Sequence, residues 1–352
     1  MKMTFRWYGS QLDPIPLRYI KQIPNMSGVV TSLMDLPAGA LWPTERISAL
    51  KEEVNAAGLE MEVIESVNVH EDIKLGLPGR DAYIDNYRET VRRLGQAGVK
   101  VICYNFMPVF DWTRTQLDHE LADGSTSLVY YQEQVDAVNP LNSDSDLTLP
   151  GWDSSYTKDG LKAVVEEYHN LTEENLGDNL KYFLEALMPV CHETGIKMAI
   201  HQDDPPWDIF GIPRLLVDKE AIGHLLSMVD DPYNCLCLCS GSLGANCKNN
   251  VPDIIRSYCD RIAFAHIRNV KHFPNGDFTE ASHRDCDGDV GILEIMRAYH
   301  DCGYDGYIRP DHGRHIWGEQ CRPGYGLYDR ALGIMYLWGC WDMLENEEKR
   351  KA

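Results

Sequence analysis

Four short apolar stretches in the second half of the chain each end on a side chain that can bind a metal ion. The residues at these ends are His201, Cys239, His266 and Asp311. Two imidazoles, a thiolate and a carboxylate suit a borderline divalent transition metal, whereas Mg²⁺ and Ca²⁺ prefer oxygen ligands. A site of this kind that keeps coordination positions open for a substrate is catalytic. The four residues therefore predict one catalytic metal site.

Alternation of side chains along the predicted strands supports this set. Successive side chains of a strand point to opposite faces of the sheet. In the stretch that ends at Cys239, one face carries Cys235, Cys237 and Cys239, and the other carries Leu236 and Leu238. Ligands that point inward and apolar side chains that point outward are what a site inside a barrel requires. Cys237 shares the inward face and is the alternative thiol ligand.

The elements that carry these residues alternate between short apolar strands and longer amphipathic helices. Eight strands are predicted, at Thr4–Tyr8, Val29–Leu33, Glu60–Glu65, Lys100–Phe106, Lys197–Asp203, Tyr233–Gly241, Arg261–Asn269 and Tyr304–Arg314. Helical spacing is clearest at Thr44–Ala57, Tyr83–Ala97, Leu176–Thr194 and Val290–Cys302. A glycine suited to a helix cap directly follows each of these four segments. Eight such units predict an α/β fold of the (β/α)₈ TIM-barrel type, which places catalytic groups at the carboxyl ends of its strands. The alternative is a mixed α/β chain with another strand count.

A long segment interrupts the alternation between the fourth and fifth strands. Residues 107–169 combine many aromatic side chains with no regular pattern until a helix signal returns. Connections of this length inside a compact domain are usually functional or disordered. We predict an irregular lid or dimer contact on the active-site face, within one barrel domain of residues 1–352. For the later half of the segment, the alternative is a surface insertion without a catalytic role.

Composition excludes several classes of protein. The net charge of −21 and the pI near 4.9 disfavour nucleic acid and anionic membranes as partners. No apolar run is long enough to span a bilayer, and the eleven cysteines lack the spacing of a secreted disulfide scaffold. We therefore expect reduced thiols and a cytoplasmic protein. Neither a G-x-x-x-x-G-K-[ST] phosphate loop nor a G-x-S-x-G nucleophile elbow occurs.

Longer runs of residues carry a resemblance to a known family. They are H-Q-D-D-P-P from His201, C-S-G-S from Cys239, H-I-R-N from His266, R-P-D-H-G from Arg309, F-R-W-Y-G from Phe5, V-I-E-S-V-N-V-H-E-D-I-K-L-G from Val63 and Y-N-F-M-P-V-F-D-W-T-R-T from Tyr104. Together they resemble the D-mannonate dehydratases of hexuronate catabolism over nearly the whole chain. The resemblance implies a (β/α)₈ barrel, one Mn²⁺ or Fe²⁺ ion per active site and dehydration of D-mannonate to 2-dehydro-3-deoxy-D-gluconate. The resemblance implies that the metal ligands are His201, Cys239, His266 and Asp311, the same four residues that the alternation of side chains along the strands indicates.

Dehydration of a sugar acid sets the further requirements. A base must remove the proton on C2, next to the carboxylate, an acid must assist loss of the hydroxyl group on C3, and a cation must stabilise the charge that develops. We predict proton transfer by His315 and Tyr328, with Arg314 fixing the substrate or lowering the pKa of a partner. For Tyr328 the alternative is an ordinary aromatic residue of a final helix, Gly326–Leu344.

Substrate recognition is predicted for a second group of residues. Asp111, Trp112 and Arg114 follow the fourth strand, whose carboxyl end opens on the same barrel face as the metal site. The guanidinium of Arg114 can hold a carboxylate or polyol oxygens in a fixed fork. His312, next to Asp311, completes the group. The alternatives are a packing role for Trp112 and a solvated charge for Arg114.

Two other classes of function remain open. One is a metal-dependent sugar isomerase or epimerase on a similar barrel, although such sites favour carboxylates and usually two metal ions. The other is a sugar-acid sensor without catalytic activity. In each case we expect a small sugar acid as the ligand, no nucleic acid or membrane partner, and a homo-oligomer, specifically a dimer.

Overall fold

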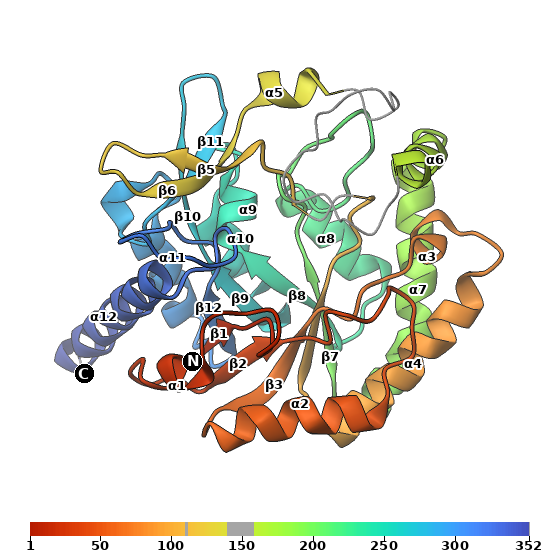
Figure 1. Ribbon diagram of the computed structural model, residues 1–352, viewed down its shortest axis with the longest axis horizontal. Helices are drawn as coiled ribbons and strands as arrows, with labels where there is room; N and C mark the ends of the chain where they lie inside the picture. The colour runs from red at the N-terminus through yellow and green to blue at the C-terminus, as the bar shows by residue number, and fades with distance from the viewer. Residues whose placement is uncertain (110–111, 139–157, 352) are drawn as a thin grey trace.

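The computed structural model describes residues 1–109, 112–138 and 158–351 and contains a closed barrel of eight parallel strands (Figure 1). The strands are β1 (Lys2–Arg6), β2 (Gly28–Thr31), β3 (Glu60–Glu65), β4 (Val101–Tyr104), β7 (Lys197–His201), β8 (Asn234–Cys239), β9 (Ile262–Ile267) and β12 (Tyr307–Pro310). They close in the order β1-β12-β9-β8-β7-β4-β3-β2. All eight predicted strands are confirmed, and the fold is the predicted (β/α)₈ barrel.

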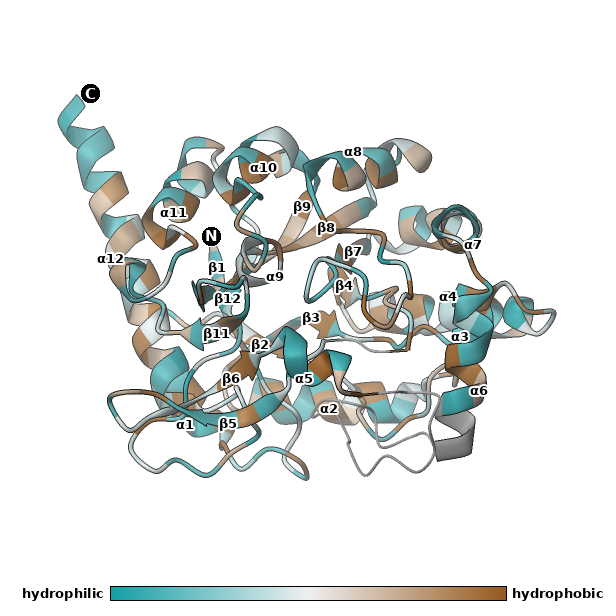
Figure 2. Cartoon of the chain, turned by 90° about the horizontal axis from the view of Figure 1, so that it is seen from above, coloured by the Kyte–Doolittle hydropathy of each residue, from teal (hydrophilic) through white to brown (hydrophobic). Residues whose placement is uncertain are grey.

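Helices surround the barrel. They include α1 (Leu17–Lys21), α2 (Thr44–Ala56), α3 (Glu71–Leu75), α4 (Arg80–Gln96), α7 (Glu173–Thr194), α8 (Lys219–Met228), α9 (Ser240–Gly244), α10 (Val251–Tyr258), α11 (Ile292–Asp301) and α12 (Leu327–Lys351). The last of these extends past the barrel at its C-terminal end (Figure 1, Figure 2). Gly58, Gly98, Gly195 and Gly303 have the positive φ of left-handed caps, as predicted. Within the described ranges, no helix combines the length and apolar content that crossing a bilayer requires.

Two sets of apolar side chains form the core of the barrel. One set fills the inside of the barrel, and a larger set packs between the strands and the helices. In β8, Cys235 and Cys237 belong to the inner set, whereas Leu236 and Leu238 belong to the outer set. The predicted parity is therefore confirmed. All eleven cysteines of the chain are unpaired.

A four-stranded antiparallel sheet covers part of the barrel face, and the sequence did not predict it. Its order is β10-β11-β6-β5, with β5 (Gln116–Glu120) and β6 (Thr126–Tyr130) from one connection and β10 (Asn269–His272) and β11 (Phe278–Ala281) from another. The segment 107–169 also contains α5 (Gln132–Asp136) and α6 (Lys158–His169). The prediction that this segment is irregular was therefore wrong for its described part. The sheet links two loops that are far apart in sequence.

Candidate metal centre

The four predicted ligands meet at one end of the barrel. Candidate ligand atoms of His201, Cys239, His266 and Asp311 all lie within 4.8 Å of one another. The strand register explains this arrangement, because His266 on β9 pairs with Cys239 on one side and with Arg309 on the other. Asp311 directly follows β12. These carboxyl ends of parallel strands are where barrels carry their chemistry.

The ring nitrogens of the two histidines are arranged for ligand binding. Nδ1 of His201 lies 2.6 Å from the carbonyl oxygen of Gln202, which can only accept a hydrogen bond, so Nδ1 carries the proton and Nε2 is left for a ligand. Nε2 of the buried His266 lies 3.4 Å from Oε2 of Glu65 and Nδ1 lies 3.9 Å from Oδ2 of Asp311, and among the described residues neither nitrogen makes a well-aligned hydrogen bond. A buried polar atom without a partner is costly, and a metal ion at this point would use it. The nitrogen donors therefore fit a divalent transition metal.

The other two donors carry negative charge. Burial alone would raise the pKa of Cys239, but the nearby Arg268 guanidinium and the adjacent imidazoles of His201 and His266 bring it down to about 5. Burial would also raise the pKa of Asp311, yet the positive charges of His312, when protonated, and Arg309 hold it well below its usual range. Both groups are ionised at neutral pH. A thiolate, a carboxylate and two imidazoles make a donor set that suits Mn²⁺, Fe²⁺ or Zn²⁺.

The alternative thiol, Cys237, lies one layer deeper in the barrel. Its sulfur forms a second close group with Cys103 and His266. Burial and the neighbouring Cys103 thiol raise the pKa of Cys237 well above its usual range. A protonated thiol is a poor metal ligand. Of the two thiols, Cys239 has the ionisation state that a metal site needs.

A charged layer supports the candidate ligands. Nη2 of Arg309 donates to both oxygens of Glu65 at 2.9 and 3.1 Å, and Nη1 lies 2.9 Å from Oδ1 of Asp311. Burial alone would raise the pKa of Glu65, but Arg309 and His266 hold it well below its usual range. The charge of Arg6 acts in the same direction. Glu65 is therefore an anion that orients the side chains around the site.

A buried network joins the barrel to the accessory sheet. Nη1 and Nη2 of Arg114 donate to the two oxygens of Asp204 at 3.0 Å each, and Nη2 also donates to Oε1 of Glu280 at 2.8 Å. Arg268 donates to Asp204 at 2.8 Å. The prediction that Arg114 binds substrate is not supported by this position, because its fork already holds two protein carboxylates. Its alternative as a solvated charge is wrong, since the side chain is fully buried.

His312 connects this network to Tyr325. Its Nδ1 lies 3.0 Å from Nη1 of Arg268 and 3.3 Å from Oε1 of Glu280, and its Nε2 lies 3.0 Å from the hydroxyl oxygen of Tyr325. The ring of Trp112 contacts the ring of His312 at a centroid distance of 5.3 Å. His312 and Trp112 therefore lie next to the candidate ligands, and their predicted contact with the substrate stays a prediction. Tyr325 was not predicted from the sequence, and the structure places its hydroxyl group next to His312.

Two of the predicted catalytic residues organise the loop that follows β12. Nη2 of Arg314 lies 2.9 Å from Oδ1 of Asp329, and Nη1 lies 3.0 Å from Oδ2 of Asp123. Nε2 of His315 accepts a hydrogen bond of 3.1 Å from the backbone N–H of Gly324. These hydrogen bonds occupy the guanidinium of Arg314 and Nε2 of His315, the groups that catalysis would need. The catalytic roles of both residues stay predictions, and their positions give them no support.

The third predicted catalytic residue lies on the outer side of α12. Tyr328 is exposed, and its ring packs against that of Trp317 at a centroid distance of 5.5 Å. The structure does not bring Tyr328 to the four candidate ligands. Tyr325, three residues earlier, contacts His312 instead. Asp111, predicted to bind substrate, lies outside the described residues.

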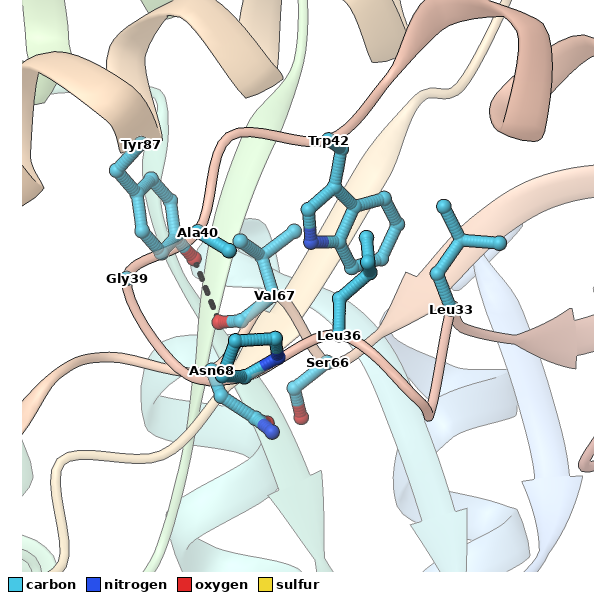
Figure 3. A pocket seen from close by; sticks show the side chains of 10 residues that line it. Leu33, Leu36, Gly39, Ala40, Trp42, Ser66, Val67, Asn68 and Tyr87 are labelled. Carbon is cyan, nitrogen blue, oxygen red and sulfur yellow. Dashed lines mark hydrogen bonds between the residues drawn. The ribbon is translucent and has the colours of Figure 1, made fainter.

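A hollow on the rim of the barrel is separate from these groups. It lies beside the ends of β2 and β3 and is lined by Leu33, Leu36, Pro37, Gly39, Ala40, Trp42, Ser66, Val67, Asn68 and Tyr87 (Figure 3). The hydroxyl group of Tyr87 donates to the carbonyl oxygen of Val67 at 3.2 Å across one side of it. This lining offers no carboxylate, imidazole or thiol. The chemistry is therefore assigned to the metal cluster and to His312.

Comparison with known proteins agrees with this geometry. A family model described as D-mannonate dehydratase (UxuA) matches residues 1–351. The chain belongs to the D-mannonate dehydratase family. A mannonate dehydratase of Endomicrobium trichonymphae is 56% identical, with 98% of this chain and 96% of that protein aligned. Mannonate dehydratase 1 of Halalkalibacterium halodurans is 54% identical, with coverages of 99% and 98%.

Solved structures extend the comparison. The crystal structure of mannonate dehydratase from Streptococcus suis serotype 2 is similar, with a TM-score of 0.90 and 46% identity over 97% of this chain and 94% of that one. A D-tagatose 3-epimerase-like protein has a TM-score of 0.56 at 12% identity, with 99% of each chain covered. This second likeness concerns the fold alone. The D-mannonate dehydratase family is metal-dependent. The cluster of four candidate ligands in this chain agrees with that property.

Proposed function

We propose that this chain catalyses the metal-dependent dehydration of D-mannonate to 2-dehydro-3-deoxy-D-gluconate and water, a step of hexuronate catabolism. The observation that carries the proposal is the contact between the ligand cluster and the proton-transfer pair. Oδ1 of Asp311 lies 4.0 Å from Nε2 of His312, which in turn meets Tyr325. Family membership over the full chain supports the choice of substrate.

The reaction needs a cation and two proton transfers. The proton on C2 and the hydroxyl group on C3 leave together as water, and the enol that remains rearranges to the 2-keto acid. His201, Cys239, His266 and Asp311 would hold the divalent ion, Mn²⁺ or Fe²⁺ in this proposal. When bound, the ion supplies positive charge that stabilises the negative charge developing beside the substrate carboxylate.

His312 and Tyr325 perform the proton transfers in this proposal. Protonated His312 can donate from Nδ1 to Glu280 and from Nε2 to the hydroxyl oxygen of Tyr325, so it can replace a proton that this hydroxyl group gives up. Neutral His312 that keeps its proton on Nδ1 can take a proton back at Nε2. Because Nδ1 has a partner in both protonation states, the ring can take up and release a proton without moving. The network around Arg268 and Glu280 thereby holds the acid–base pair in place.

Arg6 is a buried cation that we propose as the group that binds the substrate. It is only 4% exposed and lies at the carboxyl end of β1. Its Nη1 lies 3.4 Å from the carbonyl oxygen of Val30, its Nη2 lies 3.6 Å from the sulfur of Met34, and the guanidinium lies over the ring of Tyr8. Among the described residues, no carboxylate forms an ion pair with it. We infer that Arg6 takes over the role predicted for Arg114 and binds the carboxylate of the sugar acid.

Replacement of Arg6 by methionine is expected to raise the KM for mannonate by about tenfold to a hundredfold, because a hydrogen bond to a charged group is worth about 1.5–3 kcal/mol. Steady-state kinetics with metal-saturated enzyme measures the change, and Arg6→Lys should recover part of it. The control is Lys2→Met, since Lys2 lies on the same strand at the opposite end and pairs with Glu62 at 2.9 Å. An unchanged KM for Arg6→Met would exclude the role.

The enzyme should prefer mannonate strongly over gluconate, its epimer at C2. The two acids present the C2 proton on opposite faces, and a base buried in a fixed network can reach only one of them at hydrogen-bond distance. Gluconate should still bind, so the loss should appear mainly in kcat. Kinetics on both substrates under metal saturation checks this. Similar kcat values would mean that the His312–Tyr325 pair is mobile or does not act as the base.

The direct test of the function is release of a 2-keto acid by purified protein. Metal-stripped protein is given mannonate, gluconate and other aldonates, with Mn²⁺ or Fe²⁺ added back in turn. Formation of the 2-keto-3-deoxy acid from mannonate supports the proposal. Interconversion of ketose epimers without loss of water would favour the epimerase alternative, and binding without turnover would favour the sensor. The epimerase alternative has only fold-level likeness in its favour.

Two further expectations belong to the proposal. The unpaired state of all eleven cysteines supports a reducing compartment, and we place the protein in the cytoplasm. We also propose that the working unit is a homodimer of one barrel domain per chain. Fractionation of cells and sedimentation of the purified protein test these two statements.

A further inference from the structure

Among the described residues, a second group of side chains can hold a metal ion, one layer below the candidate metal centre. Its members are Cys103, Cys237 and His266, and their ligand atoms all lie within 4.8 Å of one another. All three side chains are buried. The two cysteines belong to the set of side chains that fills the inside of the barrel, and His266 is shared with the candidate centre above. Neither thiol has a part in the proposed dehydration.

The strand order brings the two thiols together. Cys103 lies on β4 and Cys237 lies on β8, and both strands pair with β7, which runs between them. The partner of Cys103 on β7 is Ala199, which belongs to the same set inside the barrel. Because the side chain of Ala199 is a single methyl group, the longer cysteine side chains can approach each other across it.

The spacing of the strands favours an ion between the two sulfurs over a disulfide bond. Neighbouring strands lie about 4.8 Å apart, so the Cα atoms of residues on strands separated by a third lie roughly 9 Å apart in an eight-stranded barrel. A disulfide bond requires Cα atoms within about 7 Å. Metal–sulfur bonds of about 2.3 Å place two sulfurs of a tetrahedral site about 3.8 Å apart. That separation agrees with the close group that the two thiols form.

His266 can supply the third donor from the ring nitrogen that faces away from Asp311. Its Nδ1 lies on the side of Asp311, 3.9 Å from Oδ2, whereas its Nε2 lies 3.4 Å from Oε2 of Glu65. Glu65 is the partner of Cys103 in the pairing of β3 with β4. Nε2 is therefore turned toward the strand that carries the first of the two thiols. The ring has a nitrogen for each of the two groups.

We propose that Cys103, Cys237 and His266 form a second metal site, which takes a thiophilic divalent ion such as Cd²⁺ or Zn²⁺. Two sulfur donors select a soft ion, whereas Mn²⁺ prefers oxygen ligands. Binding releases the two thiol protons to the solvent, because a thiolate is the form that coordinates a metal. The charges of the two thiolates then balance that of the ion, so the inside of the barrel gains no unpaired charge.

The shared imidazole makes the deeper site a competitor of the catalytic one. A neutral imidazole has one nitrogen with a free lone pair and one N–H group, so His266 can bind one ion at a time. A thiophilic ion in the deeper site therefore removes a ligand from the ion above and inhibits the enzyme. This competition rests on the proposed role of His266 in the catalytic centre, whereas binding by the two thiols can be measured without substrate.

The test gives one equivalent of Cd²⁺ to reduced, metal-stripped protein and records the ultraviolet absorption of cadmium–thiolate bonds. The wild type should show the absorption of two such bonds. Cys103→Ala and Cys237→Ala should each show the weaker absorption of a single bond, because the ion then has only one thiolate within reach. Cys239→Ala should keep the full absorption of the wild type, since Cys239 belongs to the upper group.

Cys235→Ala is the matched control. Cys235 is buried on the same inward face of β8, but its thiol donates to the carbonyl oxygen of Pro232 at 3.2 Å and lies outside the group. This variant should bind Cd²⁺ as the wild type does. Circular dichroism checks the fold of each variant, and the two separate thiol variants keep the test decisive if one of them does not fold. Absorption that disappears in Cys239→Ala but persists in Cys103→Ala and Cys237→Ala would overturn the proposal, as would an equal loss in the control.

Addition of Mn²⁺ tests the competition for His266. Excess Mn²⁺ should raise the concentration of Cd²⁺ that is needed for the two-bond absorption, in proportion to the concentration of Mn²⁺. Electron paramagnetic resonance of free Mn²⁺ in the same samples measures how much Mn²⁺ is bound. Bound Mn²⁺ that leaves the Cd²⁺ titration unchanged would overturn the sharing of His266. Mn²⁺ that does not bind at all would instead contradict the proposed catalytic centre.

Discussion

Replacement of Tyr325 by phenylalanine should lower kcat by about a hundredfold to ten-thousandfold, the range that one positioned acid or base contributes. The variant loses only the hydroxyl group that lies 3.0 Å from Nε2 of His312. Its ring should keep its contacts with Tyr8 and His312. The matched control is Tyr328→Phe, three residues later, which should change kcat by less than about twofold because the residue lies on the outer side of α12.

The measurement is single-turnover and steady-state kinetics on both variants, with metal content determined in parallel. His312→Asn should show a loss of similar size, and the double variant should be little worse than either single one, since the two residues act as a unit. A large loss for Tyr328→Phe with full activity for Tyr325→Phe would reverse the assignment and restore the one derived from the sequence.

Removal of divalent metal should lower turnover by about a thousandfold or more, because Lewis-acid stabilisation is worth several kcal/mol and each 1.4 kcal/mol is about a factor of ten. Asp311→Asn and His266→Ala should each weaken metal binding and abolish activity while circular dichroism stays unchanged. Dialysis against a chelator, followed by titration with Mn²⁺ or Fe²⁺, measures both effects. Full activity in metal-free buffer would contradict the assignment of these residues to a catalytic metal site.

Metal uptake should also release protons. Burial alone would lower the pKa of His201, but the hydrogen bond and the negative charge of the Cys239 thiolate raise it to about 10. At neutral pH the ion must therefore displace a proton from this imidazole, and apparent metal affinity should increase as pH rises toward 10. Calorimetry in buffers of different ionisation enthalpy counts the protons. An affinity independent of pH would argue against His201 as a ligand.

The barrel and the ligand cluster could be predicted because both follow from local patterns. Apolar residues that alternate with Cys235, Cys237 and Cys239 define which face of β8 is inward, and the end of the strand defines the height of the side chain in the barrel. Neither property depends on distant residues. The same reasoning could have found Arg6, which ends the inward face of β1, had the first strand been read in the same way.

The residues whose predicted roles find no support in their positions depend on distant partners. Arg114 looks like a free cation in the sequence, but it is neutralised by Asp204 and Glu280, which are 90 and 166 residues away. Tyr325 and Tyr328 lie in the same short stretch, and only the start of α12 at Leu327 decides which one faces the site. A shift of three residues near a helix start separates a buried side chain from an exposed one.

The accessory sheet had a signal that went unused. Asp123-Gly124 joins β5 to β6, and Asn275-Gly276 lies between β10 and β11; both dipeptides favour tight hairpins. The strands themselves are short and partly polar, so their hydrophobic pattern is weak. Pairing of β6 with β11 brings together two connections that are more than a hundred residues apart, and no local pattern predicts it.

The ion pair between Arg114 and Glu280 has a consequence for engineering this enzyme. Loops of (β/α)₈ barrels are commonly treated as exchangeable modules that can be grafted one at a time. Here the connection after β4 supplies the guanidinium and the connection after β9 supplies the carboxylate, and both groups are buried at 2.8 Å. Exchange of the connection after β4 alone would leave Asp204 and Glu280 to share Arg268, and exchange of the connection after β9 alone would leave Arg114 with Asp204 as its one carboxylate partner among these groups. The two connections form a single unit for grafting and for directed evolution.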